Sequence, residues 1–329
     1  MLSYKKVFNP KKTEIFKTPG AKKAGAAKEQ YAGDRRDGLV YVYDDDIVLA
    51  VNVALSVKRP LLIRGASGSG KSSLALNVAR YFKWRYYEVV ISSGTQARDL
   101  LWQFDTLRRL SDAQADVGVK DDVHYVEPGV LWWAFEPESA RLRGAEQSTT
   151  GVIPAIDPNK GEGDEHERAV VLLDEIDKAD PDTPNNLLVP LGSLEFFVTD
   201  AKRKVKAKEP PLVVITSNDE RELPTAFLRR CIMLNLKPPT RARLVDIAVA
   251  HFGRGNRNLY EEVAKLLVPE DDPNKTEATE SKSQQSAAEY LDTVSACLAL
   301  DIEPKAKDTT WEALSRVTLW KPKELPGAN

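Results

Sequence analysis

One glycine-rich stretch constrains the fold of this chain more than any other part of the sequence. Residues 61–73 read LLIRGASGSGKSS, and residues 65–72 fill the pattern G-x-x-x-x-G-K-[ST]. The apolar residues at its start predict a buried strand, and the spacing of apolar residues over 73–82 predicts an amphipathic helix. A strand, a glycine-rich turn and a helix in this order predict an α/β fold with a phosphate-binding loop.

The residue types in this loop suit the phosphates of a nucleotide. Glycines let backbone N–H groups approach phosphate oxygens, and the start of a helix adds unpaired donors. We expect Lys71 to reach the β- and γ-phosphates and the Ser72 hydroxyl to bind Mg²⁺. A chance Gly-Lys-Ser in a surface loop is the alternative, and the flanking strand and helix argue against it. The predicted nucleotide-binding residues are Gly65, Ala66, Ser67, Gly68, Ser69, Gly70, Lys71, Ser72 and Ser73.

Polar side chains follow two further apolar runs. Val170 to Leu173 form a continuous apolar segment, as strands of parallel sheets require, and Asp174 and Glu175 come directly after it. Open α/β sheets bind ligands at the carboxyl ends of their strands, so Asp174 is placed to hold Mg²⁺ and Glu175 to polarise an attacking water. The alternative is an acidic loop after a core strand. Asn218 follows the apolar strand 212–216 and is placed to hydrogen-bond a water or a phosphate.

The composition is that of an ordinary soluble globular protein. Of 329 residues, 42% are hydrophobic and 29% charged, and the net charge of −2 gives no support for nucleic-acid binding. The two cysteines, Cys231 and Cys297, lack metal-ligand spacing, which fits a reducing compartment. No run approaches ~18 apolar residues, and the N-terminus lacks an apolar signal core. We therefore expect no transmembrane helix and a cytoplasmic location.

Other segments carry weaker signals. Residues 1–30 hold eight lysines against two glutamates, which favours a solvated, mostly disordered arm over an arm that docks on an acidic neighbour. Trp132 and Trp133 are expected to be packing residues rather than a base-stacking platform, because no basic residues interleave with them. Periodicity and turn residues predict helices over 44–59, 95–110, 240–252, 260–267, 287–298 and 309–319, the last with a Thr309/Glu312 capping box, and strands over 86–91 and 232–236.

Two basic groups have open interpretations. Residues 191–209 predict a hairpin with a cluster of basic side chains, which either contacts an acidic partner or solvates an exposed strand. We expect this cluster to contact protein rather than DNA. Arg229 and Arg230, before the strand 232–236, are either surface charges or phosphate sensors. The hairpin cluster consists of Lys202, Arg203, Lys204, Lys206 and Lys208.

Together these segments resemble AAA+ ATPases, and among them the MoxR-like, dynein-related branch. The resemblance spans residues 40–325 and rests on GASGSGKS, VVLLDEIDKADPDTPNNLL, LGSLEFFV and VVITSNDERELPTAFLRRC, followed by a helical tail. It implies a P-loop α/β core with a five-stranded parallel sheet and a small C-terminal helical lid. It also implies ATP and Mg²⁺ as ligands and self-association into a ring, commonly a hexamer, with ATP between subunits.

The resemblance also implies roles for individual residues. Residues 121–136 resemble the helix-two insert and 191–209 the pre-sensor hairpin, elements that usually face the pore or the partner. Arg229 and Arg230 match the segment that carries the arginine finger, with Arg230 preferred. The remaining matches are Lys71 and Ser72 for Walker A, Asp174 and Glu175 for Walker B with Glu175 as the catalytic carboxylate, and Asn218 for sensor 1.

The lid matches the family less closely. Its sensor 2 arginine usually starts a lid helix, and here only Arg316, Lys321 and Lys323 are available. The long separation of the two Walker motifs implies an insertion around residues 111–168. The resemblance divides the chain into a basic N-terminal arm (1–39), an ATPase core (40–238) and a helical lid (239–329), with 269–286 as a mobile loop.

The implied function is a chaperone-like ATPase that remodels or assembles a protein client, often with a von Willebrand A-type partner. One alternative is a nucleic-acid-associated NTPase motor of the restriction or defence type, which includes GTP-using relatives and would bind DNA in a salt-dependent way. Another alternative is a nucleotide-gated scaffold that binds ATP and hardly turns it over. Nucleic-acid binding and membrane association are not expected from the composition.

Overall fold

The chain forms two compact units in the computed structural model. The first unit comprises Met1–Pro10, Asp44–Arg64 and Ser72–Asn235, and the second comprises Lys11–Tyr43, Gly65–Lys71 and Leu236–Asn329. The structure describes residues 4–16, 38–115, 118–146, 151–160, 163, 167–268, 286–304 and 309–319.

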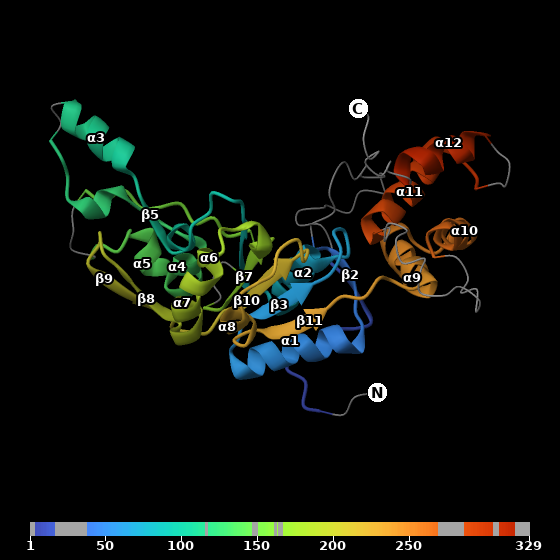
Figure 1. The fold of residues 1–329 in the computed structure, drawn as a ribbon, viewed down its shortest axis with the longest axis horizontal. Coiled ribbons are helices and arrows are strands. Elements are labelled where there is room, and N and C mark those ends of the chain that lie inside the picture. Colours follow the sequence, from blue (N-terminus) through green and yellow to red (C-terminus); the bar gives the residue numbers. More distant parts are fainter. Residues whose placement is uncertain are drawn as a thin grey trace. The chain divides into compact units, whose positions relative to one another are not determined.

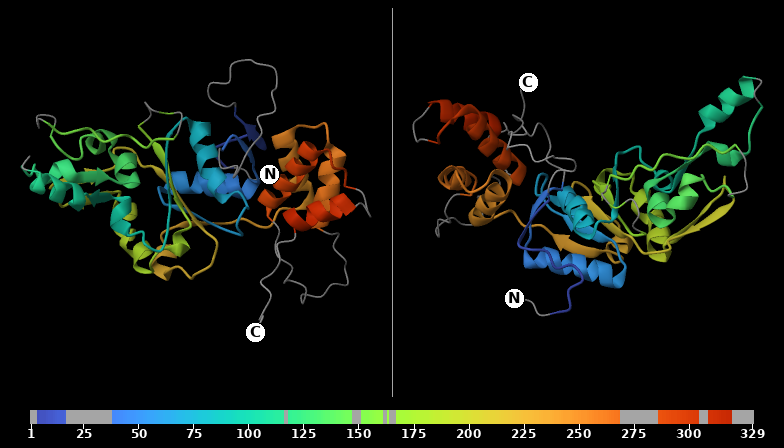
Figure 2. Two further views of the ribbon diagram at one scale, coloured as in Figure 1. Left: turned by 90° about the horizontal axis from the view of Figure 1, so that it is seen from above. Right: turned by 180° about the vertical axis from the view of Figure 1, so that it is seen from behind.

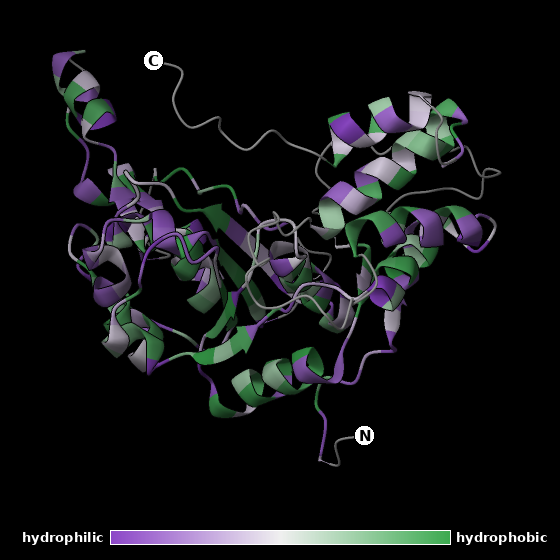
Figure 3. Ribbon diagram, turned by 45° about the vertical axis from the view of Figure 1, so that its right-hand side comes forward, coloured by the Kyte–Doolittle hydropathy of each residue, from purple (hydrophilic) through white to green (hydrophobic). Residues whose placement is uncertain are grey.

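A five-stranded parallel sheet forms the centre of the first unit, as the sequence predicts (Figure 1). The strands are β4 and β7 at one side, β10 and β3 in the middle, and β11 at the other edge. Both faces of the sheet are covered, so its strands are rich in apolar residues. Figure 3 shows the sheet as predominantly hydrophobic. In the order β11-β3-β10-β7-β4, the bounds are Ile232–Asn235, Leu61–Arg64, Leu212–Ser217, Ala169–Asp174 and Arg85–Val90.

Two long helices flank the phosphate-loop segment in the sequence. The first, α1 (Asp45–Val57), begins with two acidic residues as expected and packs against β11 and β3. It ends at Lys58, which adopts the left-handed conformation (φ 56°, ψ 41°) and donates its N–H to the carbonyl of Ala54. The second helix, α2 (Lys71–Phe82), follows the loop directly and confirms the strand–loop–helix order.

The first residues of the chain pack onto the first unit. Phe8 is fully buried, and its ring centroid lies 4.8 Å from that of Tyr81 and 5.6 Å from that of Phe82. The buried Asn52 of α1 accepts hydrogen bonds from the N–H groups of Val7 (2.7 Å) and Phe8 (2.8 Å) and donates to the Phe8 carbonyl (2.6 Å). The expectation of a solvated arm is therefore wrong for residues 4–10, because a buried aromatic side chain anchors them; residues 17–37 lie outside the described part.

The helix predicted over residues 95–110 does not form. The segment is instead a 3₁₀ turn, η1 (Ala97–Leu100), a short strand, β5 (Trp102–Phe104), and a helix, α3 (Thr106–Gln114). β5 pairs antiparallel with β6 (Val126–Pro128), which follows η2 (Asp122–Tyr125). This pairing overrides the local helical pattern. α3 stands away from the sheet of the first unit and buries no residue (Figures 1 and 2).

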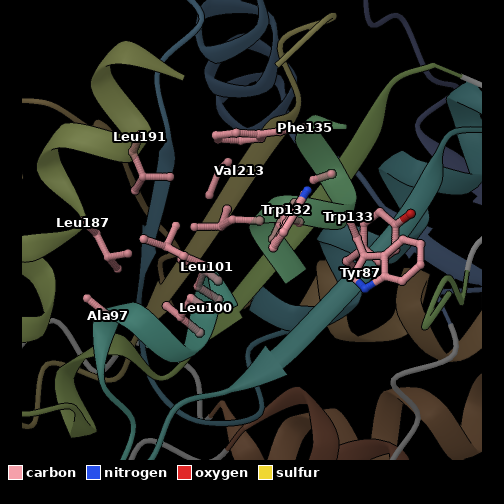
Figure 4. Packing of buried hydrophobic residues seen from close by; sticks show 14 of the residues in the cluster. Tyr87, Ala97, Leu100, Leu101, Trp132, Trp133, Phe135, Leu187, Leu191 and Val213 are labelled. Atoms are coloured by element: carbon pink, nitrogen blue, oxygen red, sulfur yellow. The ribbon is translucent and has the colours of Figure 1, made fainter. Parts of the chain in front are cut away.

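The predicted hairpin forms from β8 (Glu195–Val198) and β9 (Arg203–Lys206). Its Phe196 ring stacks on Trp102 and meets Trp132 edge-on. Trp132 and Trp133 lie in the buried cluster shown in Figure 4, which confirms them as packing residues. The short helices of this region are α4 (Val130–Phe135), α5 (Pro137–Arg141), η3 (Ile176–Lys178), α6 (Asp182–Asn186), α7 (Leu188–Ser193) and α8 (Thr225–Leu228).

Part of the insertion covers the edge strand β4. The N–H of Tyr86 donates to the Asn159 side chain (2.8 Å), and the N–H of Lys160 donates to the Tyr86 carbonyl (2.9 Å). The buried Arg85 donates to the carbonyls of Trp133 and Glu167, both at 2.8 Å. The bonds with Asn159 and Lys160 satisfy the two backbone groups of Tyr86, which an exposed edge strand would leave unpaired.

Helices dominate the second unit, as predicted for the C-terminal part. The buried rings of Tyr260 and Tyr290 lie in its core, and the Tyr290 hydroxyl donates to the Tyr260 carbonyl (3.0 Å). A small antiparallel pair, β1 (Thr13–Ile15) and β2 (Val40–Val42), belongs to the same unit, so residues 13–15 also depart from a solvated arm. The helices are α9 (Arg241–Phe252), α10 (Arg257–Leu267), α11 (Ala287–Leu300) and α12 (Thr309–Thr318).

Capping in this unit differs from the prediction. Thr309 is the first helical residue of α12 rather than its N-cap, whereas Ser286 and Glu289 form a capping box at the start of α11. Of the predicted mobile loop 269–286, all but Ser286 lies outside the described residues. Within the part of the chain that the structure describes, no helix is long and apolar enough to cross a membrane.

Candidate functional site

The first unit brings Ser72 and Asp174 together. The Ser72 hydroxyl, in the first turn of α2, donates to Asp174 Oδ1 at 2.8 Å. The hydroxyl of Thr216, near the end of β10, donates to the same oxygen at 2.5 Å. Asp174, at the end of β7, is only 3% exposed. The two hydroxyl groups therefore supply hydrogen bonds that this buried carboxylate needs. A hydroxyl beside a carboxylate is a donor set that suits Mg²⁺ when phosphate oxygens complete its shell.

Glu175 is held in an uncommon backbone conformation. Its φ of 62° and ψ of 50° lie in the left-handed region, which costs a non-glycine residue of the order of 1 kcal/mol. Its N–H donates to the Thr216 hydroxyl at 2.8 Å, so Thr216 links the two acidic residues. The sharp turn directs the chain away from β7 immediately after Asp174.

Both oxygens of the Glu175 carboxylate have partners. The side-chain amide of Asn218 donates to Oε1 at 3.2 Å, and the ammonium group of Lys178 donates to Oε2 at 2.8 Å. The hydrogen bond and charge of Glu175 raise the pKa of Lys178, and the charges of Glu220 and Asp177 add to this effect. The structure thus places the predicted sensor residue directly on the predicted catalytic carboxylate.

Asp177 holds the loop that carries Asn218. It is 2% exposed, and its Oδ2 accepts hydrogen bonds from the N–H groups of Asn218 (3.1 Å) and Glu220 (3.0 Å). Its Oδ1 has no partner among the described residues. Arg64 at the end of β3 pairs with Asp219 at 2.5 Å and fastens the other side of this loop.

In the second unit, Lys71 folds back over the glycine-rich loop. Its ammonium group donates to the carbonyls of Gly65 (2.7 Å) and Ala66 (2.8 Å), and the residue is buried. Gly65 requires the absence of a side chain, because a Cβ would lie 2.9 Å from the carbonyl oxygen of Leu236. The buried hydroxyl of Ser69 has no partner among the described residues. A tight loop with a lysine and a spare hydroxyl fits the phosphates of a nucleotide.

The start of α11 packs directly against this loop. The N–H of Ala288 donates to the Gly68 carbonyl at 3.2 Å, and a Cβ on Gly68 would lie 2.5 Å from the Ser286 hydroxyl oxygen. The helix start that meets the loop is therefore Ser286-Ala287-Ala288, without a basic side chain. Of the candidates for sensor 2, Arg316 lies in the last turn of α12, and Lys321 and Lys323 lie outside the described residues, so the position of sensor 2 stays a prediction.

Arg229 and Arg230 follow α8 and are both exposed. The Arg230 guanidinium donates to the carbonyl of Ala226 at 3.3 Å. Among the described residues, no bond joins either arginine to Asp174 or Glu175, so the structure leaves them at the surface of the first unit.

The basic hairpin is partly neutralised. Arg203 pairs with Glu136 (3.1 Å) and Lys204 with Glu195 (2.9 Å). The hydrogen bond and charge of Lys204, with the charge of Lys206, lower the pKa of the Glu195 carboxyl. The surface is therefore less positive than the run of lysines suggests.

Sequence reasoning missed several residues that contact the predicted ones. Thr216 and Lys178 touch Asp174 or Glu175, Asp177 fastens Asn218, and Ser286 meets the loop. The sequence spacing could have indicated Lys178, because in a single turn a residue lies close to the residue three positions before it. No signal in the sequence pointed to Ser286, because a long segment separates it from the loop.

Comparison with known proteins identifies a family for this chain. The AAA domain (dynein-related subfamily) matches residues 60–231 of this chain. No curated protein matches the chain in sequence.

Solved structures of low sequence identity align with parts of this chain. A putative ATPase from Cytophaga hutchinsonii aligns at 13% identity and a TM-score of 0.40 over 65% of this chain and 51% of its own length. The RuvB Holliday junction branch migration motor of Thermotoga maritima aligns at 14% identity and a TM-score of 0.44 over 84% of this chain and 69% of its own. The chain thus spans about half the length of the first of these proteins.

Proposed function

The chain belongs to the dynein-related subfamily of AAA domains, and from this premise we propose that it is a MoxR-like, chaperone-like ATPase that uses ATP and Mg²⁺ to remodel or assemble a protein client. The observation that carries the ATPase proposal is the carboxylate of Glu175, held by Asn218 at 3.2 Å beside the Ser72–Asp174 pair. Members of the AAA+ family bind nucleotides and hydrolyse them, and these residues supply a base and a polar orienting group.

The proposed division of labour follows the two groups of residues. The loop from Gly65 to Ser73 binds the phosphates, with Lys71 on the β- and γ-phosphates. Ser72 and Asp174 would hold Mg²⁺, which would supply positive charge beside the transferred phosphoryl group. Glu175 takes the proton of the attacking water, while that water's oxygen bonds to the γ-phosphorus and the bond to the bridging oxygen of ADP breaks. Asn218 orients Glu175.

The proposal extends to architecture and partners. We assign residues 40–238 to the core and 239–329 to the lid, with residues 1–39 as an N-terminal extension. A ring, with a hexamer as the first expectation, would let Arg229 or Arg230 act on a neighbouring subunit, which their exposure supports. The partner class is a protein, including a von Willebrand A-type domain. The two free, buried cysteines support a reducing cytoplasmic setting.

Nucleotide turnover tests this function directly. Phosphate release should depend on Mg²⁺ and fall to background when EDTA removes it. Lys71→Ala should abolish nucleotide binding. Glu175→Gln should retain binding of a fluorescent ATP analogue and lose turnover by about 10²–10⁴-fold, the usual contribution of a general base. Glu262→Gln in α10 is the control, because it removes another lysine-paired glutamate. Turnover that survives in Glu175→Gln contradicts the assignment of Glu175 as the catalytic carboxylate. A parallel assay with GTP measures the preference for adenine over guanine nucleotides.

The client is tested by recovery and stimulation. The native protein, isolated in the presence of ATP, and the Glu175→Gln variant should each retain a bound client protein that mass spectrometry identifies. When this client is added to the purified wild-type protein, the ATPase rate should change. Fluorescence anisotropy with DNA is the counter-test. Tight binding that falls steeply with salt and is lost in Arg203→Ala/Lys204→Ala/Lys206→Ala would overturn the protein-client proposal in favour of a nucleic-acid motor.

A further inference from the structure

The catalytic carboxylate proposed above is engaged by a neighbour that the reaction does not need. η3 turns the chain back after Glu175, and the N–H of Lys178 donates to the Glu175 carbonyl at 3.0 Å. This turn brings the ammonium group of Lys178 to 2.8 Å from Glu175 Oε2. Asn218 already donates to the other oxygen, so the two carboxylate oxygens each carry a donor.

Other acidic side chains also lie near the ammonium group of Lys178. Glu220 and Asp177 lie near enough to act on its charge, in addition to Glu175. The Lys178 side chain is 40% exposed and the Glu175 side chain 22% exposed, so the ammonium group approaches from the solvent side. An ion pair of this exposure is weak and its long side chain is flexible, so it opens readily.

We propose that Lys178 restrains hydrolysis: its ammonium group occupies Oε2 of Glu175 and must move away before that oxygen can accept a proton from the attacking water. A general base needs an oxygen within hydrogen-bonding reach of the water, and an ammonium group cannot accept or relay that proton. Asn218 donates to the opposite oxygen and can stay in place. The inference rests on the proposed function, because it takes Glu175 as the base.

The restraint separates two properties that a structural role would not separate. Lys178 bonds to the base and not to the phosphate loop in the contacts that the structure describes, so its removal should raise kcat and leave KM unchanged. Loss of a merely structural contact would lower stability and turnover together. A positively charged arginine should keep the pair and the slow rate.

The test is steady-state ATP hydrolysis by the full chain. Lys178→Met should raise kcat by about twofold to fivefold, the factor that an exposed ion pair represents, with KM unchanged. Lys178→Arg should retain the slow rate. Lys265→Met is the matched control, because Lys265 also pairs with a glutamate three residues earlier in the chain, at 2.6 Å in α10. The gain must disappear when Glu175→Gln is combined with Lys178→Met.

The outcomes distinguish this inference from the function it rests on. Wild-type hydrolysis that requires Glu175, with an unchanged or lower kcat in Lys178→Met, overturns the restraint and leaves the proposed function standing. Wild-type protein without Glu175-dependent hydrolysis overturns both. Thermal unfolding checks that Lys178→Met folds like Lys265→Met; if it does not, Lys178→Gln carries the same expectation, and an unchanged kcat in that variant refutes the restraint.

Discussion

A buried carboxylate outside the predicted catalytic set holds the backbone of Asn218, the predicted sensor residue. Asp177 accepts the N–H groups of Asn218 and Glu220 through one oxygen. Asp177→Ala leaves both donors without that acceptor, and a donor that stays buried and unsatisfied costs about 1–3 kcal/mol. We expect a lower free energy of unfolding in urea and at least a tenfold loss of ATP turnover, because Asn218 no longer fixes Glu175.

The exposed Asp182 provides the control for this prediction. Asp182→Ala should leave unfolding and turnover at the wild-type level. Full turnover in Asp177→Ala, with a normal urea midpoint, would show that the 218–220 loop holds its place without this carboxylate.

At the residue scale, the sequence predicts the polar residues at the strand ends but not the residues that contact them. Asp174, Glu175 and Asn218 stand directly after apolar runs, so a parallel sheet had to bring them to one edge. Thr216 and Lys178 reach the same carboxylates because Glu175 turns into the left-handed region. That conformation is uncommon for glutamate, and no pattern in the sequence announces it.

At the scale of elements, the contact between the phosphate loop and α11 has no room for a larger residue. Gly68 has a φ of +72°, and a Cβ there would lie 2.7 Å from the Cβ of Ser286. Gly68→Ala should weaken nucleotide binding by about tenfold, since left-handed backbone costs alanine roughly 1–2 kcal/mol and the helix start must also shift. The measurement is titration with a fluorescent ATP analogue.

A double variant separates the two causes. Ser286→Gly in the Gly68→Ala background removes the two closest contacts but not the backbone strain, so it should restore part of the affinity. Gly94→Ala is the control, because a Cβ at Gly94 meets nothing within 4 Å. Equal affinities for Gly68→Ala and Gly94→Ala would mean that nucleotide binds to a loop that has left both this backbone conformation and the contact with α11.

The N-terminal segment makes a second prediction for elements. Phe8 is fully buried against Tyr81 and Phe82. Phe8→Ala should lower the free energy of unfolding by about 3–5 kcal/mol, the usual cost of removing a buried phenylalanine side chain. Phe197→Ala, at a residue 54% exposed, should change it little. Equal urea midpoints for the two variants would show that residues 4–10 do not contribute to stability.

The elements that the sequence predicted share one property, which is a strong local pattern of apolar residues. In α1 and the helices of the second unit this pattern is an apolar residue every three to four positions, and in the strands of the sheet it is a short apolar run. Residues 95–110 carry a helical period too, yet β5 pairs with β6 and the N–H of Gly129 donates to the Leu101 carbonyl. A contact between segments far apart in sequence decided that region, and local patterns cannot report such contacts.

At the scale of the whole molecule, the proposed ATPase reaction would need positive charge on the γ-phosphate beyond that of Lys71 and Mg²⁺. An arginine supplied by a neighbouring subunit is worth ~10³–10⁵ in rate in related mechanisms. Arg230 is exposed, and its one described bond from the side chain goes to the carbonyl of Ala226. Head-to-tail association into a ring would present this arginine to the next subunit.

Mixed assemblies test whether the site is shared. Arg230→Ala should keep its fold and its ATP affinity and lose most of its turnover, and Lys71→Ala should be inactive alone. In an equal mixture, random assembly pairs an intact loop with an intact arginine at about a quarter of the interfaces, so activity should return in part. Light scattering under ATP measures the ring size, and Arg229→Ala shows which arginine acts. Full activity from a monomer, or from Arg230→Ala and Arg229→Ala alike, would place the missing positive charge within the subunit itself.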